Sequence, residues 1–310
     1  MYKHLKKIST VGMSHEEWLV HRKKAVGGSD AAAILGMNSY SSPYSVWAEK
    51  LGKTPPVEDN EAMRLGRDLE DYVAKRFTEK TGKKVQRENA IIYNPDIPFA
   101  HANIDRRIVG EDAILECKTT SVLSLGKFKN GEYPDNYYVQ VMHYLAVTGA
   151  KKAYLAVLVL GREFLVFEIE RDEEEIAALM KTEEMFWQFV QNGTPPGVDG
   201  TKATTDAISA VYPHSNGETV SLGHLDLDLK RREALKAQIK DLQSLVDDIE
   251  NRIKAQMGEA GKGDSGSYRV SWTSQTKRTF DRKRYEEDHG ALPESYYKTS
   301  ESRTFRVTKK

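Results

Sequence analysis

The chain has 310 residues, and its 46 lysines and arginines are balanced by 46 aspartates and glutamates, so that the formal net charge is zero. A mean hydropathy of −0.60, together with the lack of any apolar run of about 18 residues, excludes a membrane span. The single cysteine, Cys117, excludes a disulfide framework, a cysteine-rich zinc site and an iron–sulfur cluster. Because the N-terminus has no apolar secretory signal, we expect a cytoplasmic protein whose size allows one large domain or two.

The first predicted helices lie on either side of a glycine pair. Ser14, followed three residues later by Glu17, forms a capping box that begins one helix. Gly27-Gly28 ends that helix, and an alanine-rich second helix follows. We expect Ser29 or Asp30 to be the N-cap of the second helix, because both residue types accept hydrogen bonds from free backbone N–H groups.

This corner also has the composition of a phosphate site. A hydroxyl from Ser29, a guanidinium from Arg22 and the close backbone approach that Gly28 allows would together suit an anion at a helix start. An ordinary corner between two helices explains the same residues, and both interpretations stay open at this point.

A long amphipathic helix is predicted over residues 59–81. Its apolar face consists of Met63, Leu65, Leu69, Val73 and Phe77. Glu70 lies among these apolar side chains, so its carboxylate is expected to reach toward the core, whereas most helical glutamates are exposed to solvent. Short strands are predicted next, over 85–93 and 97–118.

Apolar residues on both sides of Gly110 predict a β-hairpin. Glu116 and Lys118 are two residues apart on its second strand, so their side chains leave the same face. Asp105, at the start of the first strand, can reach that face too. Cys117 points to the opposite face and is expected to be buried filler.

Two carboxylates and an ammonium at one spot suit Mg²⁺-dependent hydrolysis of phosphodiesters. Carboxylates are hard oxygen ligands for Mg²⁺ or its substitute Mn²⁺, and the lysine orients or activates the attacking water and offsets developing negative charge. A solvated surface ion pair is the competing interpretation, because Glu-x-Lys arises easily by chance in a chain that is 30% charged. The apolar first half of the strand favours a site at the end of a core strand.

A largely buried helix is predicted over 137–145, with Gln140 and Tyr144 one turn apart on one face. A glutamine in such an apolar segment is costly unless it is paired, so Gln140 either bonds to backbone or faces a polar site. The first part of the chain then continues with a hairpin of strands 153–160 and 163–169 and ends with a helix over 172–191.

The last third of the chain begins with a connector over 201–222, in which we expect a short helix and a strand. A strong helix over 225–257 carries an apolar stripe with alternating spacings of four and three residues. The stripe consists of Leu235, Ile239, Leu242, Val246, Ile249 and Ile253. It needs a partner, which is another subunit, a second protein or the first part of the same chain.

Beyond this helix, residues 258–266 are expected to be a flexible break, and alternation from Tyr268 to Trp272 predicts a strand. The basic segments 277–284 and 303–310 could bracket DNA, since a DNA enzyme needs a positive groove rather than a positive total charge. Aromatic residues in and near these segments would stack on bases or, more commonly, form the core of a small domain.

The order of these elements resembles the restriction-endonuclease-like nuclease fold, and more closely the phage-type exonuclease family that includes lambda exonuclease and the YqaJ viral recombinases. Five short motifs in matching order carry the resemblance, which covers residues 14–196. They are Arg22 with Gly28-Ser29-Asp30, Gly66-Arg67-Asp68-Leu69-Glu70, Asn103-Ile104-Asp105, Leu115-Glu116-Cys117-Lys118 and Gln140-Val141-Met142-His143-Tyr144. The implied fold is an α/β core with a central mixed sheet flanked by helices, plus a long C-terminal helix and a small α+β extension. We expect a nuclease core over 1–200, a connector over 201–224 and the C-terminal helix with its basic extension over 225–310.

The resemblance also implies a metal site and its chemistry. Asp105 and Glu116 would bind the metal, and the backbone carbonyl of Cys117 would be a further ligand. Glu70 would contribute from its helix, directly or through water. Lys118 would activate the nucleophilic water.

Further residues match the family positions around the substrate. Gln140 would help to position the water or the metal, and Arg22 and Ser29 match the positions that hold the 5′-phosphate of the resected strand. Asn103 is a departure, because lambda-type enzymes have a serine there near the phosphate. An asparagine can still donate a hydrogen bond at that place.

Members of this family degrade the 5′-ended strand of linear duplex DNA with Mg²⁺, often as ring-shaped trimers. The resemblance therefore implies a phage or prophage 5′→3′ exonuclease that acts on double-stranded ends and leaves 3′ single-stranded tails for homologous recombination. A homo-oligomer and a single-strand annealing protein as partner are implied with it. The alternatives are an endonuclease of the same fold and a DNA-binding scaffold with a vestigial site, against which the intact Asp105, Glu116 and Lys118 argue.

Overall fold

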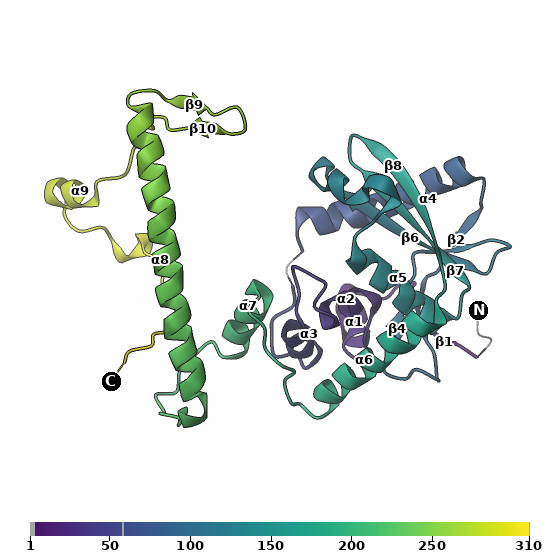
Figure 1. The fold of residues 1–310 in the computed structure, drawn as a ribbon. Coiled ribbons are helices and arrows are strands. Elements are labelled where there is room, and N and C mark those ends of the chain that lie inside the picture. Colours follow the sequence, from purple (N-terminus) through teal and green to yellow (C-terminus); the bar gives the residue numbers. More distant parts are fainter. Residues whose placement is uncertain (1–3, 58, 310) are drawn as a thin grey trace. The chain divides into compact units, whose positions relative to one another are not determined.

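A five-stranded mixed sheet, in the order β2-β5-β6-β7-β8, forms the centre of the part of the chain up to Pro213. In the computed structural model, which describes residues 4–57 and 59–309, these strands are β2 (Val85–Arg87), β5 (Arg106–Ile108), β6 (Ala113–Thr120), β7 (Lys152–Val159) and β8 (Glu163–Glu170). Strands β6 and β7 run parallel and the other neighbours antiparallel. Helix α5 (Asp135–Thr148) lies in the crossover that a parallel pair requires (Figure 1).

The two faces of this sheet pack against different helices. Ile114 belongs to a core with α5, whereas Leu115 packs with Phe77 of α4 (Glu61–Thr81). Because successive strand residues point to opposite faces, Glu116 and Lys118 share the α5 face with Ile114. Cys117 packs on the α4 side, as expected from the alternation.

A second sheet, in the order β1-β3-β4, lies beside the first. Its strands are β1 (Lys6–Ser9), β3 (Ala90–Tyr93) and β4 (His101–Ala102). The strand predicted over 85–93 is therefore two strands in two different sheets. Glu88 lies between them. Its backbone N–H donates to the Asp105 carbonyl at 3.4 Å, and its carboxylate accepts hydrogen bonds from Lys7 and Arg107.

The N-terminal helices confirm one capping prediction and correct another. Ser14 and Glu17 form the predicted capping box of α1 (His15–Arg22). Helix α2 (Gly28–Ile34), however, has Gly27 as its N-cap, so the assignment to Ser29 or Asp30 was wrong. Asp30 lies at the third position of the helix, from which its carboxylate reaches back and accepts a hydrogen bond from the Gly27 backbone N–H at 2.9 Å.

The remaining helices of this part cover the sheet and its edges. Helix α4 starts at an Asn60 cap and ends at Gly82, whose φ of 71° is easily reached only by glycine. The predicted face of α4 is buried at Val73 and Phe77, whereas Met63 is 43% exposed. The others are α3 (Pro43–Lys50), the short 3₁₀ segment η1 (Val122–Gly131), α6 (Glu173–Gln191) and α7 (Lys202–Val211). The connector over 201–222 contains α7 but no strand, which corrects that prediction.

The second compact unit begins at His214 and is dominated by one long helix. Its elements are η2 (Gly223–Leu225), α8 (Asp226–Met257), β9 (Lys262–Asp264), β10 (Arg269–Ser271), α9 (Arg282–His289) and η3 (Glu294–Tyr296). The predicted helix and the strand near Tyr268 are confirmed. The segment 258–266 is not simply a break, because it contains β9, which pairs antiparallel with β10. No helix in the described part of the chain is both long and apolar enough to cross a membrane.

Candidate active site

Asp105 and Glu116 meet at the edge of the sheet where β5 and β6 pair. Asp105 immediately precedes β5, and its Oδ2 accepts a hydrogen bond of 2.7 Å from the backbone N–H of Cys117. This bond continues the ladder in which Arg106 lies opposite Leu115. Glu116 is only 4% exposed, so the hairpin places a nearly buried carboxylate beside the Asp105 carboxylate.

Lys118 and Gln140 connect the Glu116 carboxylate to helix α5. Lys118 Nζ donates to Glu116 Oε1 at 2.6 Å and to Gln140 Oε1 at 2.9 Å. Gln140 Nε2 in turn donates to Glu116 Oε1 and to the Tyr144 hydroxyl, each at 2.9 Å. The Lys118 ammonium also lies 5.3 Å from the centre of the Tyr137 ring. All hydrogen-bonding atoms of the Gln140 amide are engaged, which explains why a glutamine is tolerated in this apolar helix.

Burial and like charge perturb the acids of this cluster. Burial, followed by repulsion from Glu116 and Glu70, raises the pKa of Asp105 well above its usual range. Burial likewise raises the pKa of Glu116, although the Lys118 ammonium opposes the shift. For Lys118, burial alone would lower the pKa, but attraction to Glu116 outweighs it and the pKa is raised. The protein therefore concentrates negative charge at a point where solvent cannot screen it.

Glu116 retains one unsatisfied acceptor that suits a cation. Its Oε2 is buried and has no hydrogen-bond partner in the described part of the chain. An orphaned carboxylate oxygen beside a second, mutually repelling carboxylate is a donor set that a hard divalent cation would satisfy. Among the residues that the structure describes, no group of three or more His, Cys, Asp or Glu side chains could hold a metal by itself. The Asp105 and Glu116 carboxylates would thus share a metal with backbone carbonyl and water ligands.

Glu70 reaches this edge from α4, but an arginine holds it. Arg106, whose side chain is nearly buried, donates from Nη1 to Glu70 and to the backbone carbonyl of Asp105, and from Nη2 to Asp71. The Glu70 side chain is 28% exposed, so it lies at the rim rather than in the core. Its charge still raises the pKa of both Asp105 and Glu116. This position allows Glu70 to act on a metal through water.

Arg22 and Ser29 contact each other in a separate charged cluster. Arg22 Nη2 donates to the Ser29 hydroxyl at 3.0 Å and to Asp30 Oδ1 at 2.9 Å, while its Nε donates to Glu49 at 3.2 Å. Lys50, whose side chain is fully buried, donates to Asp30 Oδ2 at 2.5 Å. Although burial would raise the pKa of Asp30, Lys50 and Arg22 hold it well below its usual range.

A cavity of about 380 Å³ opens beside this cluster. Its walls include Arg22, Lys23 and Arg67, and the indole of Trp18, whose ring centre lies 5.5 Å from the Arg22 guanidinium. The His15 ring stacks on the same indole at 5.7 Å. Glu49, which pairs with Arg22, and several apolar side chains also line the cavity, so the hollow combines aromatic and apolar surface with cations that are partly paired.

Gly28 joins the Arg22 cluster to the carboxylate cluster. A Cβ atom on Gly28 would lie 2.4 Å from Cε1 of Tyr144 and 3.1 Å from Cγ of Gln140. Only glycine permits this approach of the first residue of α2 to α5. The residues that hold Glu116 and the start of α2, which carries Ser29, are therefore in direct contact.

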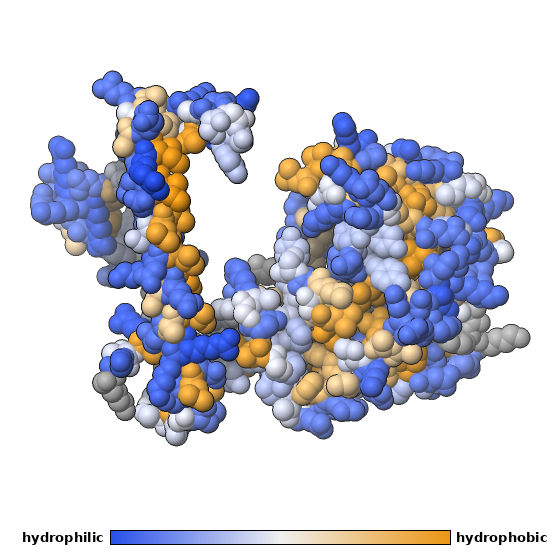
Figure 2. All heavy atoms as spheres, in the orientation of Figure 1, coloured by the Kyte–Doolittle hydropathy of each residue, from blue (hydrophilic) through white to orange (hydrophobic). Residues whose placement is uncertain are grey.

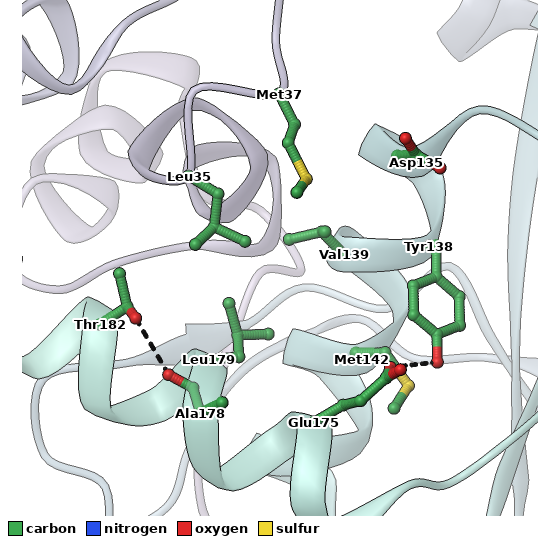
Figure 3. A pocket seen from close by; sticks show the side chains of 10 residues that line it. All are labelled: Leu35, Met37, Asp135, Tyr138, Val139, Met142, Glu175, Ala178, Leu179 and Thr182. Atoms are coloured by element: carbon green, nitrogen blue, oxygen red, sulfur yellow. Dashed lines mark hydrogen bonds between the residues drawn. The ribbon is translucent and has the colours of Figure 1, made fainter.

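A further apolar pocket of about 350 Å³ contains none of these residues. Figure 3 shows it between the end of α2, helix α5 and helix α6, with the Tyr138 hydroxyl donating to Glu175 at its rim. Its lining is Leu35, Met37, Asp135, Tyr138, Val139, Met142, Glu175, Ala178, Leu179 and Thr182. The pocket is mostly apolar and contains no cation, so it does not suit a phosphate group.

Sequence reasoning identified the residues with short-range signals and missed those paired over long distances. Asp105, Glu116 and Lys118 come together as strand alternation suggested. Gln140 faces this polar site, which is one of the two possibilities that its apolar helix left open. Arg106 was missed because strand alternation points it to the other face, and its Glu70 partner lies 36 residues away. Lys50 and Trp18 looked like ordinary helix residues. The only available signal for Trp18 was its position one turn before Arg22.

Comparisons with known proteins place the chain in a family. The family model of the YqaJ-like viral recombinase domain matches residues 17–151. Over 304 residues the chain is 41% identical to protein YqaJ of Bacillus subtilis (strain 168), covering 95% of this chain and 93% of that protein. The chain belongs to the YqaJ-like viral recombinase family. The resemblance inferred from the five motifs is thereby confirmed.

Solved structures of phage-type alkaline exonucleases share the fold. The alkaline exonuclease LHK-Exo from Laribacter hongkongensis aligns with a TM-score of 0.50 and 23% identity, over 57% of this chain and 93% of that chain. Its complex with dAMP aligns with the same TM-score of 0.50 at 24% identity, over 57% and 93%. At this identity the likeness concerns the fold. It confirms the predicted class, a central mixed sheet flanked by helices.

Proposed function

We propose that the chain is a Mg²⁺-dependent deoxyribonuclease that degrades the 5′-ended strand of linear duplex DNA. The observation that carries the proposal is the buried Glu116 carboxylate, which has one oxygen held by Lys118 and Gln140 and the other without a partner among the described residues. With Asp105 beside it, this group suits a divalent cation and a phosphodiester better than any proton-transfer chemistry alone. Membership of a viral recombinase family and the shared exonuclease fold support the same reading.

In this proposal the chain's own residues have distinct roles. Asp105 and Glu116 hold the cation, together with the Cys117 carbonyl, and Glu70 contributes through water. When bound, Mg²⁺ acts as a Lewis acid on the phosphate and lowers the pKa of a bound water. Lys118, oriented by its hydrogen bond to Gln140, positions the attacking water and offsets the charge that develops on the phosphate. Mn²⁺ would substitute, because the donors are oxygens.

The Arg22 cluster would determine which end of the strand is cut. Arg22 and Ser29 would bind a terminal 5′-phosphate, and the cavity beside Trp18 would take the attached nucleotide. Asp30 holds the Arg22 guanidinium in place, and Gly28 brings the loop against α5. Recognition through phosphate would not depend on sequence, and affinity should fall as the salt concentration rises.

The product of this reaction is a duplex with a 3′ single-stranded tail. The family resemblance adds a single-strand annealing protein as the partner that would coat this tail, and a ring-shaped trimer as the arrangement that would thread the duplex. The biological role would then be phage-style homologous recombination in a bacterial host.

The proposal is tested with three substrates. Purified protein and Mg²⁺ are incubated with linear duplex carrying a 5′-phosphate, the same duplex with a 5′-hydroxyl, and closed circular DNA. We expect faster loss of the 5′-phosphorylated strand, with the circles intact and no cleavage in EDTA. Lys118→Ala controls for contaminating nucleases, and Lys75→Ala, which changes a lysine that is 73% exposed on α4, controls for the loss of positive charge.

Each other outcome contradicts part of the proposal. Nicked or linearised circles would indicate an endonuclease. No cleavage with Mg²⁺ or with Mn²⁺ would favour a DNA-binding scaffold. Arg22→Ala should reduce the ratio of rates on 5′-phosphate and 5′-hydroxyl ends, about tenfold for the loss of one charge-assisted contact. Arg64→Ala, which removes an exposed arginine of α4, is the matched control. An unchanged ratio in Arg22→Ala would refute the phosphate pocket while leaving the nuclease intact.

A further inference from the structure

Helix α8 carries an apolar stripe that the rest of its unit leaves open. The seven side chains concerned are between 39% and 65% exposed. They are Leu235, Ile239, Leu242, Leu245, Val246, Ile249 and Ile253. Figure 2 shows apolar atoms continuing along one face of this helix, with hydrophilic atoms beside them. An apolar strip of this length on a charged helix marks an interaction surface.

The spacing of the stripe is that of a coiled-coil seam. Counting in heptads, Ile239, Val246 and Ile253 occupy the a positions, and Leu235, Leu242 and Ile249 occupy the d positions. Arg232 occupies the preceding a position and lies 5.6 Å from the centre of the Phe305 ring instead. The seam therefore begins after Arg232 and needs a second helix of matching length.

We propose that a second copy of this chain covers the stripe, with the two α8 helices antiparallel. In the register that fills every seam layer, Leu242 packs against Val246 of the partner subunit. Ile239 then packs against Ile249 of the partner subunit, and Leu235 against Ile253 of the partner subunit. The seam is complementary to itself, as an interface between identical subunits requires. This inference is independent of the proposed nuclease activity. If the chain also forms the ring-shaped trimer, each pair of α8 helices joins subunits of two different rings.

The charges beside the seam favour the antiparallel orientation. In this register Lys236 lies opposite Glu250 of the partner subunit, and two-fold symmetry makes that pair twice. Leu245, which is 63% exposed, lies against Leu245 of the partner subunit and extends the apolar layer. Parallel helices would instead place Leu245 opposite Glu250 of the partner subunit and Arg231 opposite Lys236 of the partner subunit, an apolar–acid mismatch and a like-charge pair.

The orientation is tested by cross-linking the full-length chain. Leu235→Cys and Ile253→Cys variants carry different tags and are treated, alone and mixed, with a short bis-maleimide. We expect the mixed, doubly tagged product to dominate, because Leu235 lies opposite Ile253 of the partner subunit, whereas the two copies of Leu235 lie about 27 Å apart along the helix axis. Ala237→Cys, on the outer face of α8, is the matched control, and the protein without introduced cysteines shows the contribution of Cys117. Helix content by circular dichroism checks that each variant is folded.

Each other pattern overturns the proposal. Efficient linking of Leu235→Cys to itself would mean parallel helices. No product above the Ala237→Cys level would mean that the stripe is covered by something other than a second α8, including the first unit of the same chain. Both results can be interpreted without any measurement of nuclease activity.

A charge exchange provides a second, independent test. Lys236→Glu and Glu250→Lys should each weaken self-association about tenfold, through the two affected ion pairs. Mixing the two variants should restore association, because each Glu then meets a Lys. Lys240→Glu, on the outer face, is the control for the charge change and should have no effect in sedimentation velocity. Weakening without recovery in the mixture would refute the antiparallel register.

Discussion

The two charged clusters of the first unit are built in opposite ways. At the end of β6, Asp105 and Glu116 lie beside each other with raised pKa values, and one Glu116 oxygen has no partner in the described chain. In the Arg22 cluster, the Asp30 carboxylate accepts from Lys50, Arg22 and the Gly27 backbone, and its pKa is lowered. In the first cluster the Lys118 ammonium faces two acids, whereas in the second cluster the Asp30 carboxylate is paired with two cations.

This difference separates carboxylates that serve function from a carboxylate that serves the fold. Repulsion between unscreened acids lowers stability, and a bound cation would remove that repulsion, whereas a fully paired buried acid keeps its neighbours in place. Removing the charge of Asp105 should therefore reduce activity without reducing stability. Removing the charge of Asp30 should reduce stability, because it leaves the buried Lys50 ammonium without a partner.

The largest expected effect is that of Asp105→Asn. The amide keeps the hydrogen bond from the Cys117 N–H but loses the charge, so cleavage should fall about 10³-fold, as for other groups that stabilise a developing charge. The midpoint of urea unfolding should stay the same or rise. Single-turnover cleavage and urea denaturation of the same sample measure both quantities. Asp68→Asn, at an exposed position on α4, is the control, and a strongly destabilised Asp105→Asn would contradict the comparison.

Asp30→Asn should instead lower the free energy of unfolding. It leaves the fully buried Lys50 ammonium without a counter-charge, and removing one partner of a buried pair costs about 3–5 kcal/mol of unfolding free energy. Glu49→Gln, which removes the half-buried partner of Arg22, should cost about 1 kcal/mol or less. Urea unfolding of the two variants measures the difference. Equal losses would mean that Lys50 finds another partner or water.

The first cluster could be predicted largely from the sequence, because its signals are local. A two-residue spacing on a strand and a glycine turn place Glu116, Lys118 and Asp105 together without knowledge of the rest of the fold. Gln140 was detectable because a polar amide in an apolar helix needs a partner. The long helix α8 and its stripe were likewise visible from their period.

The second cluster could not be predicted in the same way. Asp30 looked like an N-cap, and its real partner, Lys50, lies 20 residues away on another helix. No periodicity encodes such a pair, which forms only when α2 and α3 pack. For the same reason the Arg106–Glu70 pair was not foreseen, and β9 was hidden in a glycine-rich segment whose pairing depends on β10.

Gly28→Ala tests the contact between the two clusters. The added methyl group would lie 2.4 Å from the Tyr144 ring, so the ring or the loop must move, at a cost of about 1–3 kcal/mol. Because Tyr144 supports Gln140, cleavage should fall as well as stability. Gly200→Ala, where the same group meets nothing within 4 Å, is the control. If Tyr144→Leu relieves the loss in the double variant, the clash is its cause; if it does not, the clusters are not coupled through this contact.

A fall in pH should lower the free energy of unfolding through His101, which interacts with Lys50, Asp30 and Arg22. Burial, then the charge of Lys50, lowers the pKa of this histidine to about 3, against an ordinary value of 6.5, although Asp30 opposes the shift. His143 and Arg22 act in the same direction as Lys50. Below pH 6.5 the unfolded chain therefore binds a proton that the folded chain does not. Stability should be complete above that pH and fall by about 1.4 kcal/mol per pH unit as the pH decreases toward 3.

The measurement is urea unfolding between pH 8 and pH 4, for the unmodified chain and for His101→Phe. The difference between the two slopes isolates His101 from the other groups that titrate in this range, including His143 and Glu183 in the same core. His289→Phe, at an exposed position on α9, should leave the slope unchanged. Equal slopes for the unmodified chain and His101→Phe would mean that water reaches the His101 ring. Solvent would then also screen the charges of Asp30 and Lys50, and the contrast between a paired buried acid and two unscreened acids would not hold.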